Sequence, residues 1–100
     1  MNDIDIETLE QYITTGKSPL LKSVFFKECK QTFDDFGSEI CSEIDKLNSC
    51  DLKSLNAIIK EIDPIQNHGR KLTAFVFAVY AKSKFHQLTN NDIKSAFADL

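Results

Sequence analysis

The run KLTAFVFAVYAK, from Lys71 to Lys82, carries no charge between its two lysines. Elsewhere the chain is well supplied with charge, since 27% of all residues are charged. The uncharged part of this run is about ten residues long, whereas a helix needs about 20 apolar residues to cross a bilayer. The length therefore excludes a membrane span, and the run is expected inside a folded domain.

A helix fits this run better than a strand does. The segment from Phe75 to Tyr80 has the residue types of a strand, but the other apolar segments are helical and offer it no pairing partner. A helix that is apolar nearly all round is one that is surrounded by protein. We therefore predict a central helix over about 70–85, with amphipathic helices packed around it.

One alternative for this helix stays open at the level of the sequence. On a helical wheel, Leu72, Val76 and Val79 share one face, whereas Phe77 and Phe85 fall towards the opposite side. If the helix were not central, Phe77 and Phe85 would form an exposed apolar patch of the kind found at partner or oligomer surfaces.

Seven apolar side chains recur at intervals of three or four residues in the first half of the chain. They are Phe25, Cys29, Phe33, Phe36, Ile40, Ile44 and Leu47. This spacing predicts one long helix over 19–47, with Gly37 inside it at a cost of about 1 kcal/mol relative to Ala. Two helices broken near Asp34–Ser38, with Ser38 capping the second, are the alternative.

The remaining segments also have helical patterns with start and stop signals. A first helix over 5–15 ends before Gly16, and another follows Ser49 or Asp51 as its N-cap and ends before Pro64. Thr89 to Asp92 has the form of a capping box, with Asp in place of Glu. The fold class predicted for the single domain 1–100 is all-α, a bundle of four to five helices.

Composition and charge restrict the classes of function. The net charge is −3 and eleven of the twelve basic residues are lysines, with Arg70 the only arginine. A general nucleic-acid binder would carry a basic surplus and would favour arginine, so nucleic acid is an unlikely partner. The acidic N-terminus lacks the pattern of a signal peptide, and an odd number of cysteines indicates reduced thiols. A cytoplasmic protein is therefore expected.

No catalytic or metal-binding motif is found. The spacing of Cys29, Cys41, Cys50, His68 and His86 matches no common zinc pattern, so neither a metal nor a cofactor is expected. Asp34, Asp35 and Glu39 resemble an acid–base group, but neighbouring carboxylates on a helix are usually a solvated face. The turn 67–71 resembles a phosphate-binding turn at a helix N-terminus, yet with one Gly it is more simply a loop capped by Asn67. We expect a protein that is not an enzyme.

The informative feature is the charge pattern. Five acids, here called the acidic block, are concentrated in the second half of the long helix: Asp34, Asp35, Glu39, Glu43 and Asp45. The segment 66–88 is basic, with Lys82 and Lys84 near its end. Such blocks either attract one another within the fold or recognise a charged partner.

The function predicted from these features is non-enzymatic protein binding through the acidic block. Within that class, the small size and acidity favour an inhibitor such as a toxin-neutralising immunity protein, whose partner would be a basic protein, for example a nuclease toxin. The first alternative is a nucleic-acid-associated regulator that uses the basic segment 66–88. The second is a homo-oligomeric structural subunit.

Overall fold

The computed structural model describes residues 6–17, 24–62, 70–85 and 87–97. All secondary structure in these residues is helical, which confirms the all-α prediction. The helices are α1 (Ile6–Thr15), α2 (Val24–Asp45), α3 (Leu52–Ile62), α4 (Arg70–Phe85) and α5 (Asn90–Ala96).

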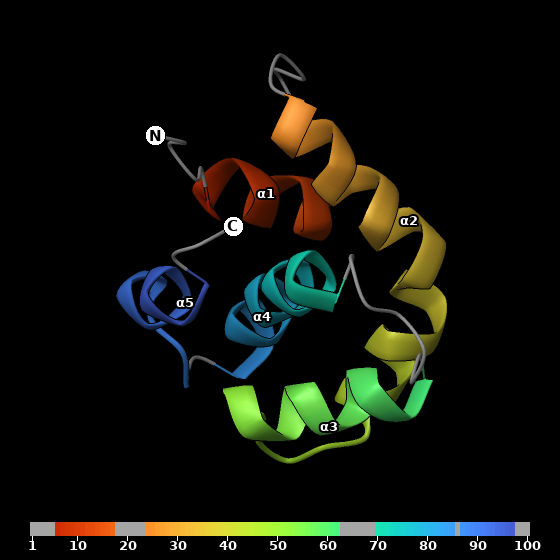
Figure 1. The fold of residues 1–100 in the computed structure, drawn as a ribbon, viewed down its shortest axis with the longest axis vertical. Helices are drawn as coiled ribbons and strands as arrows, with labels where there is room; N and C mark the ends of the chain where they lie inside the picture. The colour runs from red at the N-terminus through yellow and green to blue at the C-terminus, as the bar shows by residue number, and fades with distance from the viewer. Residues whose placement is uncertain (1–5, 18–23, 63–69, 86, 98–100) are drawn as a thin grey trace.

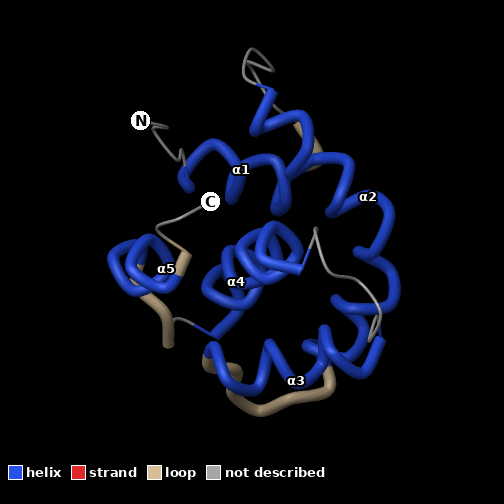
Figure 2. Tube along the Cα trace, in the orientation of Figure 1, coloured by secondary structure: helices blue, strands red, loops and turns tan. Residues whose placement is uncertain are grey.

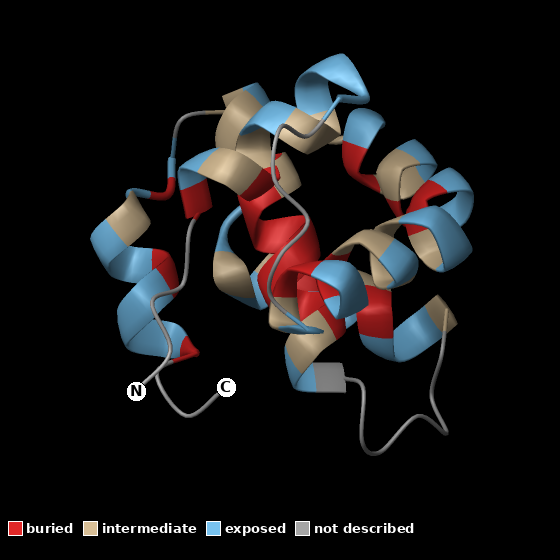
Figure 3. Ribbon diagram, turned by 90° about the horizontal axis from the view of Figure 1, so that it is seen from above, coloured by how far each residue is buried: buried red, intermediate tan, exposed pale blue. Residues whose placement is uncertain are grey.

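Helix α4 is the centre of the bundle. Figure 1 shows α1, α2, α3 and α5 arranged around it, and α4 contacts each of them. Every residue from Thr73 to Val79 is buried, and Ala81 is buried as well. In Figure 3 the buried positions are accordingly concentrated on this helix. A helix in this position needs apolar side chains on all its faces, which explains the uncharged run.

The exposed aromatic patch considered for this helix does not form at Phe77, whose side chain is 0% exposed. Phe77 packs on Phe33 of α2 with ring centroids 5.6 Å apart. Phe85, at the end of α4, is half-buried and packs against the core. Because helices lie on every side of α4, both of its aromatic faces find neighbours.

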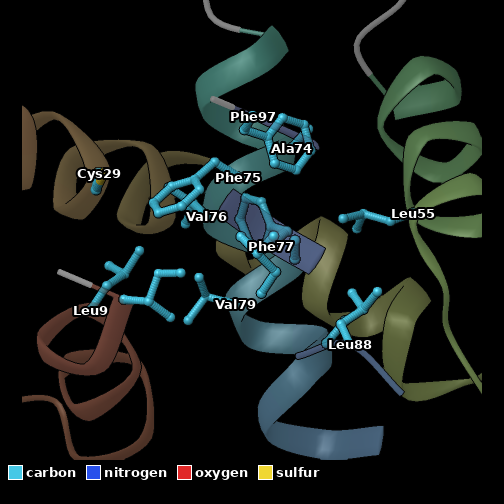
Figure 4. Packing of buried hydrophobic residues seen from close by; sticks show 14 of the residues in the cluster. Leu9, Cys29, Leu55, Ala74, Phe75, Val76, Phe77, Val79, Leu88 and Phe97 are labelled. Atoms are coloured by element: carbon cyan, nitrogen blue, oxygen red, sulfur yellow. The ribbon is translucent and has the colours of Figure 1, made fainter. Parts of the chain in front are cut away.

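Each surrounding helix contributes buried apolar side chains to the core, from Ile93 alone in α5 to Phe26, Cys29, Ile40 and Ile44 in α2. Figure 4 shows Leu9 of α1 and Leu55 of α3 directed towards the α4 side chains. Leu9, Leu55 and Cys29 of α2 are each at most 1% exposed. Leu88 precedes α5 along the chain and Phe97 follows it, and both are buried on the remaining side of the core. The amphipathic helices therefore bury their apolar stripes against α4, as their periodicity predicts.

Helix α2 is one continuous helix from Val24 to Asp45, which settles the choice between one helix and two (Figure 2). It passes through Gly37 without interruption. It ends two residues before the predicted Leu47. The predicted start at residue 19, and the capping pair 18–19, lie outside the described residues.

The described helix ends have the predicted chemistry. Gly16 has φ 75°, and its N–H donates to the Tyr12 carbonyl over 2.8 Å, which is the usual end of a helix at glycine. Asp51 rather than Ser49 caps α3, because Asp51 Oδ1 accepts from the Ser54 N–H over 2.8 Å. Thr89 and Asp92 form the predicted capping box, with both bonds at 3.1 Å. The proposed cap at Asn67 lies outside the described residues.

Candidate protein-binding surface

The acidic block occupies the second half of α2, and the structure divides it into two groups. Asp34 and Asp45 are exposed but are bound by residues of neighbouring helices. Asp35, Glu39 and Glu43 make no contact of that kind among the described residues. The two groups therefore have different roles in the fold.

Asp34 ties α2 to α1. Its Oδ1 accepts a hydrogen bond from the Tyr12 hydroxyl over 2.9 Å, and its Oδ2 pairs with Lys30 Nζ at 2.9 Å. The same ammonium lies 5.4 Å from the centre of the Tyr12 ring, a cation–π distance. The hydrogen bond from Lys30 is the main cause that lowers the pKa of Asp34, which therefore stays ionised.

Asp45 repeats this arrangement towards α4. Its Oδ1 accepts a hydrogen bond from the Tyr80 hydroxyl over 2.8 Å and pairs with Lys84 Nζ at 2.7 Å. Lys84 Nζ lies 5.5 Å from the centre of the Tyr80 ring. The bond from Lys84, and then that from Tyr80, lowers the pKa of Asp45.

The two Tyr–Asp–Lys clusters lie on either side of Phe33. Its ring centroid is 6.2 Å from that of Tyr12 and 6.3 Å from that of Tyr80. Asp34 and Asp45 are both exposed, but each accepts a hydrogen bond from a tyrosine of another helix. Asp34 and Asp45 therefore contribute to holding the bundle together.

In the second group, and among the described residues, Asp35 and Glu43 bind only residues three or four positions away along the chain. Asp35 Oδ1 accepts from Gln31 Nε2 over 2.8 Å, and Glu43 pairs with Lys46 at 2.7 Å. Glu39 is exposed and has no ion-pair partner within the part of the chain that the structure describes. Ion pairs between side chains as exposed as these contribute little to stability. The acids of this group therefore keep a negative potential at the protein surface.

Glu39 and Glu43 line an open hollow of about 510 Å³ between α2 and α3. Their neighbours in the lining are Ser38 and Ser42 of α2 and three residues of α3, namely Ile58, Glu61 and Ile62. Glu61 thus adds a third carboxylate from a different helix. In the described residues it too has no ion-pair partner.

Sequence reasoning did not single out Glu61, Ile58 or Ile62. The i, i+3, i+4 spacing of these three residues does predict that they share a face of α3. No signal in the sequence, however, indicates that this face lies beside Glu39 and Glu43, because that depends on the packing of α3 against α2.

Two lysines of the basic segment 66–88 form ion pairs with acids of other helices. Lys82 Nζ pairs with Glu10 of α1 at 2.9 Å, with both side chains less than a third exposed. Lys84 pairs with Asp45. Lys71 is exposed. Residues 66–69 and His86 lie outside the described residues.

The three cysteines are free thiols, with Cys29 and Cys50 buried and Cys41 half-buried. Burial raises the pKa of Cys29 to about 12 and that of Cys41 to about 11, and it also raises the pKa of Cys50. Such thiols are poor nucleophiles at neutral pH. Among the described residues, no group of three or more Cys, His, Asp or Glu side chains is arranged to hold a metal ion.

The described helices include none with both the length and the apolar character needed to cross a membrane. Comparison with known proteins gives no match to a family model, to a curated protein or to a solved structure.

Proposed function

We propose that this protein is a non-enzymatic binding domain that covers a basic surface of a protein partner with the acids of α2. The residues assigned to binding are Asp35, Glu39 and Glu43. Asp34 and Asp45 belong to the same block, but their bonds to Tyr12 and Tyr80 give them first a structural role.

The observation that carries this proposal is the meeting of Glu39, Glu43 and Glu61 around one hollow. Like charges at i, i+4 on a helix cost a few tenths of a kcal/mol. Among the described residues, the only ion pair made by these three acids is the one between Glu43 and Lys46. The isolated fold gains no stability from this arrangement, whereas a basic partner would gain both attraction and faster association.

Within this class, an inhibitor such as a toxin-neutralising immunity protein fits the features best. A nuclease needs a basic surface for its substrate, and an acidic protein can cover that surface as the substrate would. The small size and the acidic net charge of −3 agree with this role. We also propose a cytoplasmic location for the protein.

The alternative of a nucleic-acid-associated regulator is less well supported. The cations of Lys82 and Lys84 are held by Glu10 and Asp45, so they are less available to phosphates. Steeply salt-dependent binding of oligonucleotides, measured by fluorescence anisotropy, would favour this alternative. A change of mass between two concentrations in light scattering would favour a homo-oligomeric subunit.

The decisive experiment is charge reversal in the variant Glu39→Lys/Glu43→Lys. Its binding partner is the purified product of the adjacent open reading frame, because toxin and inhibitor genes are expected side by side. Thermal melting and pull-down are measured at low and moderate salt. We expect stability to stay within about 0.5 kcal/mol of the wild type, while binding weakens most clearly at low salt.

The matched control is Glu7→Lys/Glu28→Lys, which changes the net charge equally at exposed positions of α1 and of the first half of α2. This control should bind the partner almost as the wild type does. If the Glu39 and Glu43 variant melts much earlier, these acids stabilise the fold and the proposal loses its support. Binding that is unchanged in the variant contradicts it directly.

A further inference from the structure

The hollow between α2 and α3 is lined by two aliphatic side chains as well as by acids. Ile58 and Ile62 are half-buried, pack against the core and line the hollow. They are four residues apart on α3, so their side chains are neighbours on one face. Two adjacent aliphatic side chains that remain partly open to solvent are suited to contact an apolar side chain of a ligand.

Ser38 and Ser42 explain why space is left at this place. They are also four residues apart, and they line the α2 side of the hollow. Their short side chains do not fill the space between the helices, whereas Glu39 and Glu43 stand beside them with charged ends. The volume of about 510 Å³ lies within the range of about 300–1,000 Å³ that is usual for ligand sites.

We infer that this hollow is the docking groove for an amphipathic basic helix of the protein partner. An apolar side chain of that helix packs on Ile58 and Ile62, and its lysines or arginines face Glu39, Glu43 and Glu61. This is recognition of a helix in a groove between two helices. This inference rests on the proposed function, and it adds to the binding surface three residues of α3 that lie outside the acidic block.

Charge complementarity selects this occupant over others. Three carboxylates repel nucleic acid, free phosphate and anionic lipid surfaces. A small apolar ligand would leave the carboxylates without partners. By contrast, another hollow among the described residues, about 550 Å³ between the start of α3 and α5, is lined by Asp51 and Asp92 as well as by Lys53. Its charge does not specify a ligand.

The test uses the full chain with isotope-labelled isoleucine methyl groups, observed by NMR at low salt. The probe is a synthetic helical peptide of about 15 residues, or about four turns, with lysines at i, i+4 beside a row of leucines. A second peptide has glutamate for lysine, and a third has serine for leucine. We expect the first peptide alone to shift the Ile58 and Ile62 methyl signals strongly.

Two variants separate the roles of charge and space. Glu39→Gln/Glu61→Gln should weaken binding of the lysine peptide about three- to tenfold, the effect of losing two surface ion pairs. The control Glu7→Gln/Glu28→Gln removes the same charge elsewhere and should leave binding unchanged. Ser42→Gln, which narrows the hollow without adding charge at an exposed helical position, should also weaken binding.

The outcomes distinguish this inference from the function on which it rests. Peptide binding that leaves the Ile58 and Ile62 signals unmoved, or that is equally strong with serine for leucine, overturns the groove but not the acidic binding surface. The groove is also overturned, and the acidic binding surface is kept, if the lysine peptide fails to bind while the adjacent gene product binds through Glu39 and Glu43. If neither binds, both proposals fail.

Discussion

The hydroxyl of Tyr80 donates a 2.8 Å hydrogen bond to Asp45 and thereby joins the central helix to the last residue of α2. Lys84 Nζ binds the same carboxylate oxygen. Burial, and then the bond to Asp45, raises the pKa of Tyr80 to about 12, so the phenol remains a donor at any physiological pH.

Tyr80→Phe should lower the free energy of unfolding by about 0.5–1 kcal/mol, because one hydrogen bond at a partly exposed site is lost. The ring contacts with Phe33 and Lys84 are kept. Urea denaturation of the wild type and the variant measures the difference. Asp45→Asn, which keeps an acceptor for Tyr80 but removes the charge that binds Lys84, separates the two bonds. Equal stability of wild type and Tyr80→Phe would show that the hydroxyl contributes nothing.

The two Tyr–Asp–Lys clusters should make stability depend on pH in the acidic range. The pKa values of Asp34 and Asp45 are lower in the folded chain than the usual value of about 3.9. Their contribution is therefore complete above about pH 4 and is lost as pH falls through the folded pKa values. Because these side chains are 41% and 43% exposed, solvent screening keeps the effect small.

Denaturation of Asp34→Asn/Asp45→Asn at pH 7 and at pH 2 tests this dependence. The variant should be less stable than the wild type at pH 7 and should lose less stability between the two pH values. Asp35→Asn/Glu28→Gln removes two exposed acids outside these clusters and should keep the wild-type dependence. An acid-induced loss as large in the Asp34 and Asp45 variant as in the wild type would contradict the assignment.

The central position of α4 makes a charge there intolerable. Val76 is 0% exposed, so Val76→Asp buries an unpaired carboxylate at a cost of several kcal/mol against a total stability of about 5–15. The matched control is Val24→Asp in α2, where the side chain is 71% exposed and the expected change is within about 0.5 kcal/mol. Circular dichroism melts compare the two. A stable, fully helical Val76→Asp variant would contradict the central position of the helix.

The two described glycines should respond in opposite ways to alanine. A Cβ atom at Gly37 would meet the Phe33 ring at 3.9 Å, an ordinary contact. Gly37→Ala should therefore raise stability by about 0.5–1 kcal/mol through helix propensity. Gly16 has φ 75°, a conformation that alanine adopts only with strain, so Gly16→Ala should destabilise the chain. The reverse order of the two melting temperatures would refute this assignment.

Periodicity predicted the helices and the centre of the fold because both depend on local spacing. The uncharged run predicted a surrounded α4, and the spacing through Gly37 predicted a continuous α2. The cap at Thr89 could be predicted, and that of α3 could be narrowed to Ser49 or Asp51, because capping involves residues only three positions apart. These features need no knowledge of which helices are neighbours.

The candidate site was only partly predictable for the opposite reason. Asp34 and Glu39 are both acids on one helix, and their spacing places them on different parts of its surface but does not show which of them a neighbouring helix reaches. Their difference arises because Tyr12 of α1 reaches Asp34, whereas Glu39 faces a hollow that α3 completes with Glu61. Both relationships depend on how the helices pack, which the spacing of residues along one helix does not determine.

The order of the helices along the chain has a consequence for synthesis on the ribosome. Helices α1, α2 and α3 are made first, but the helix against which all of them bury their apolar sides begins only at Arg70. Until α4 has left the exit tunnel, the nascent chain displays aliphatic and aromatic side chains without a common core, a state prone to aggregation. We therefore expect the core to be completed only after α4 has emerged from the ribosome, although α2 also contacts α1 and α3 directly.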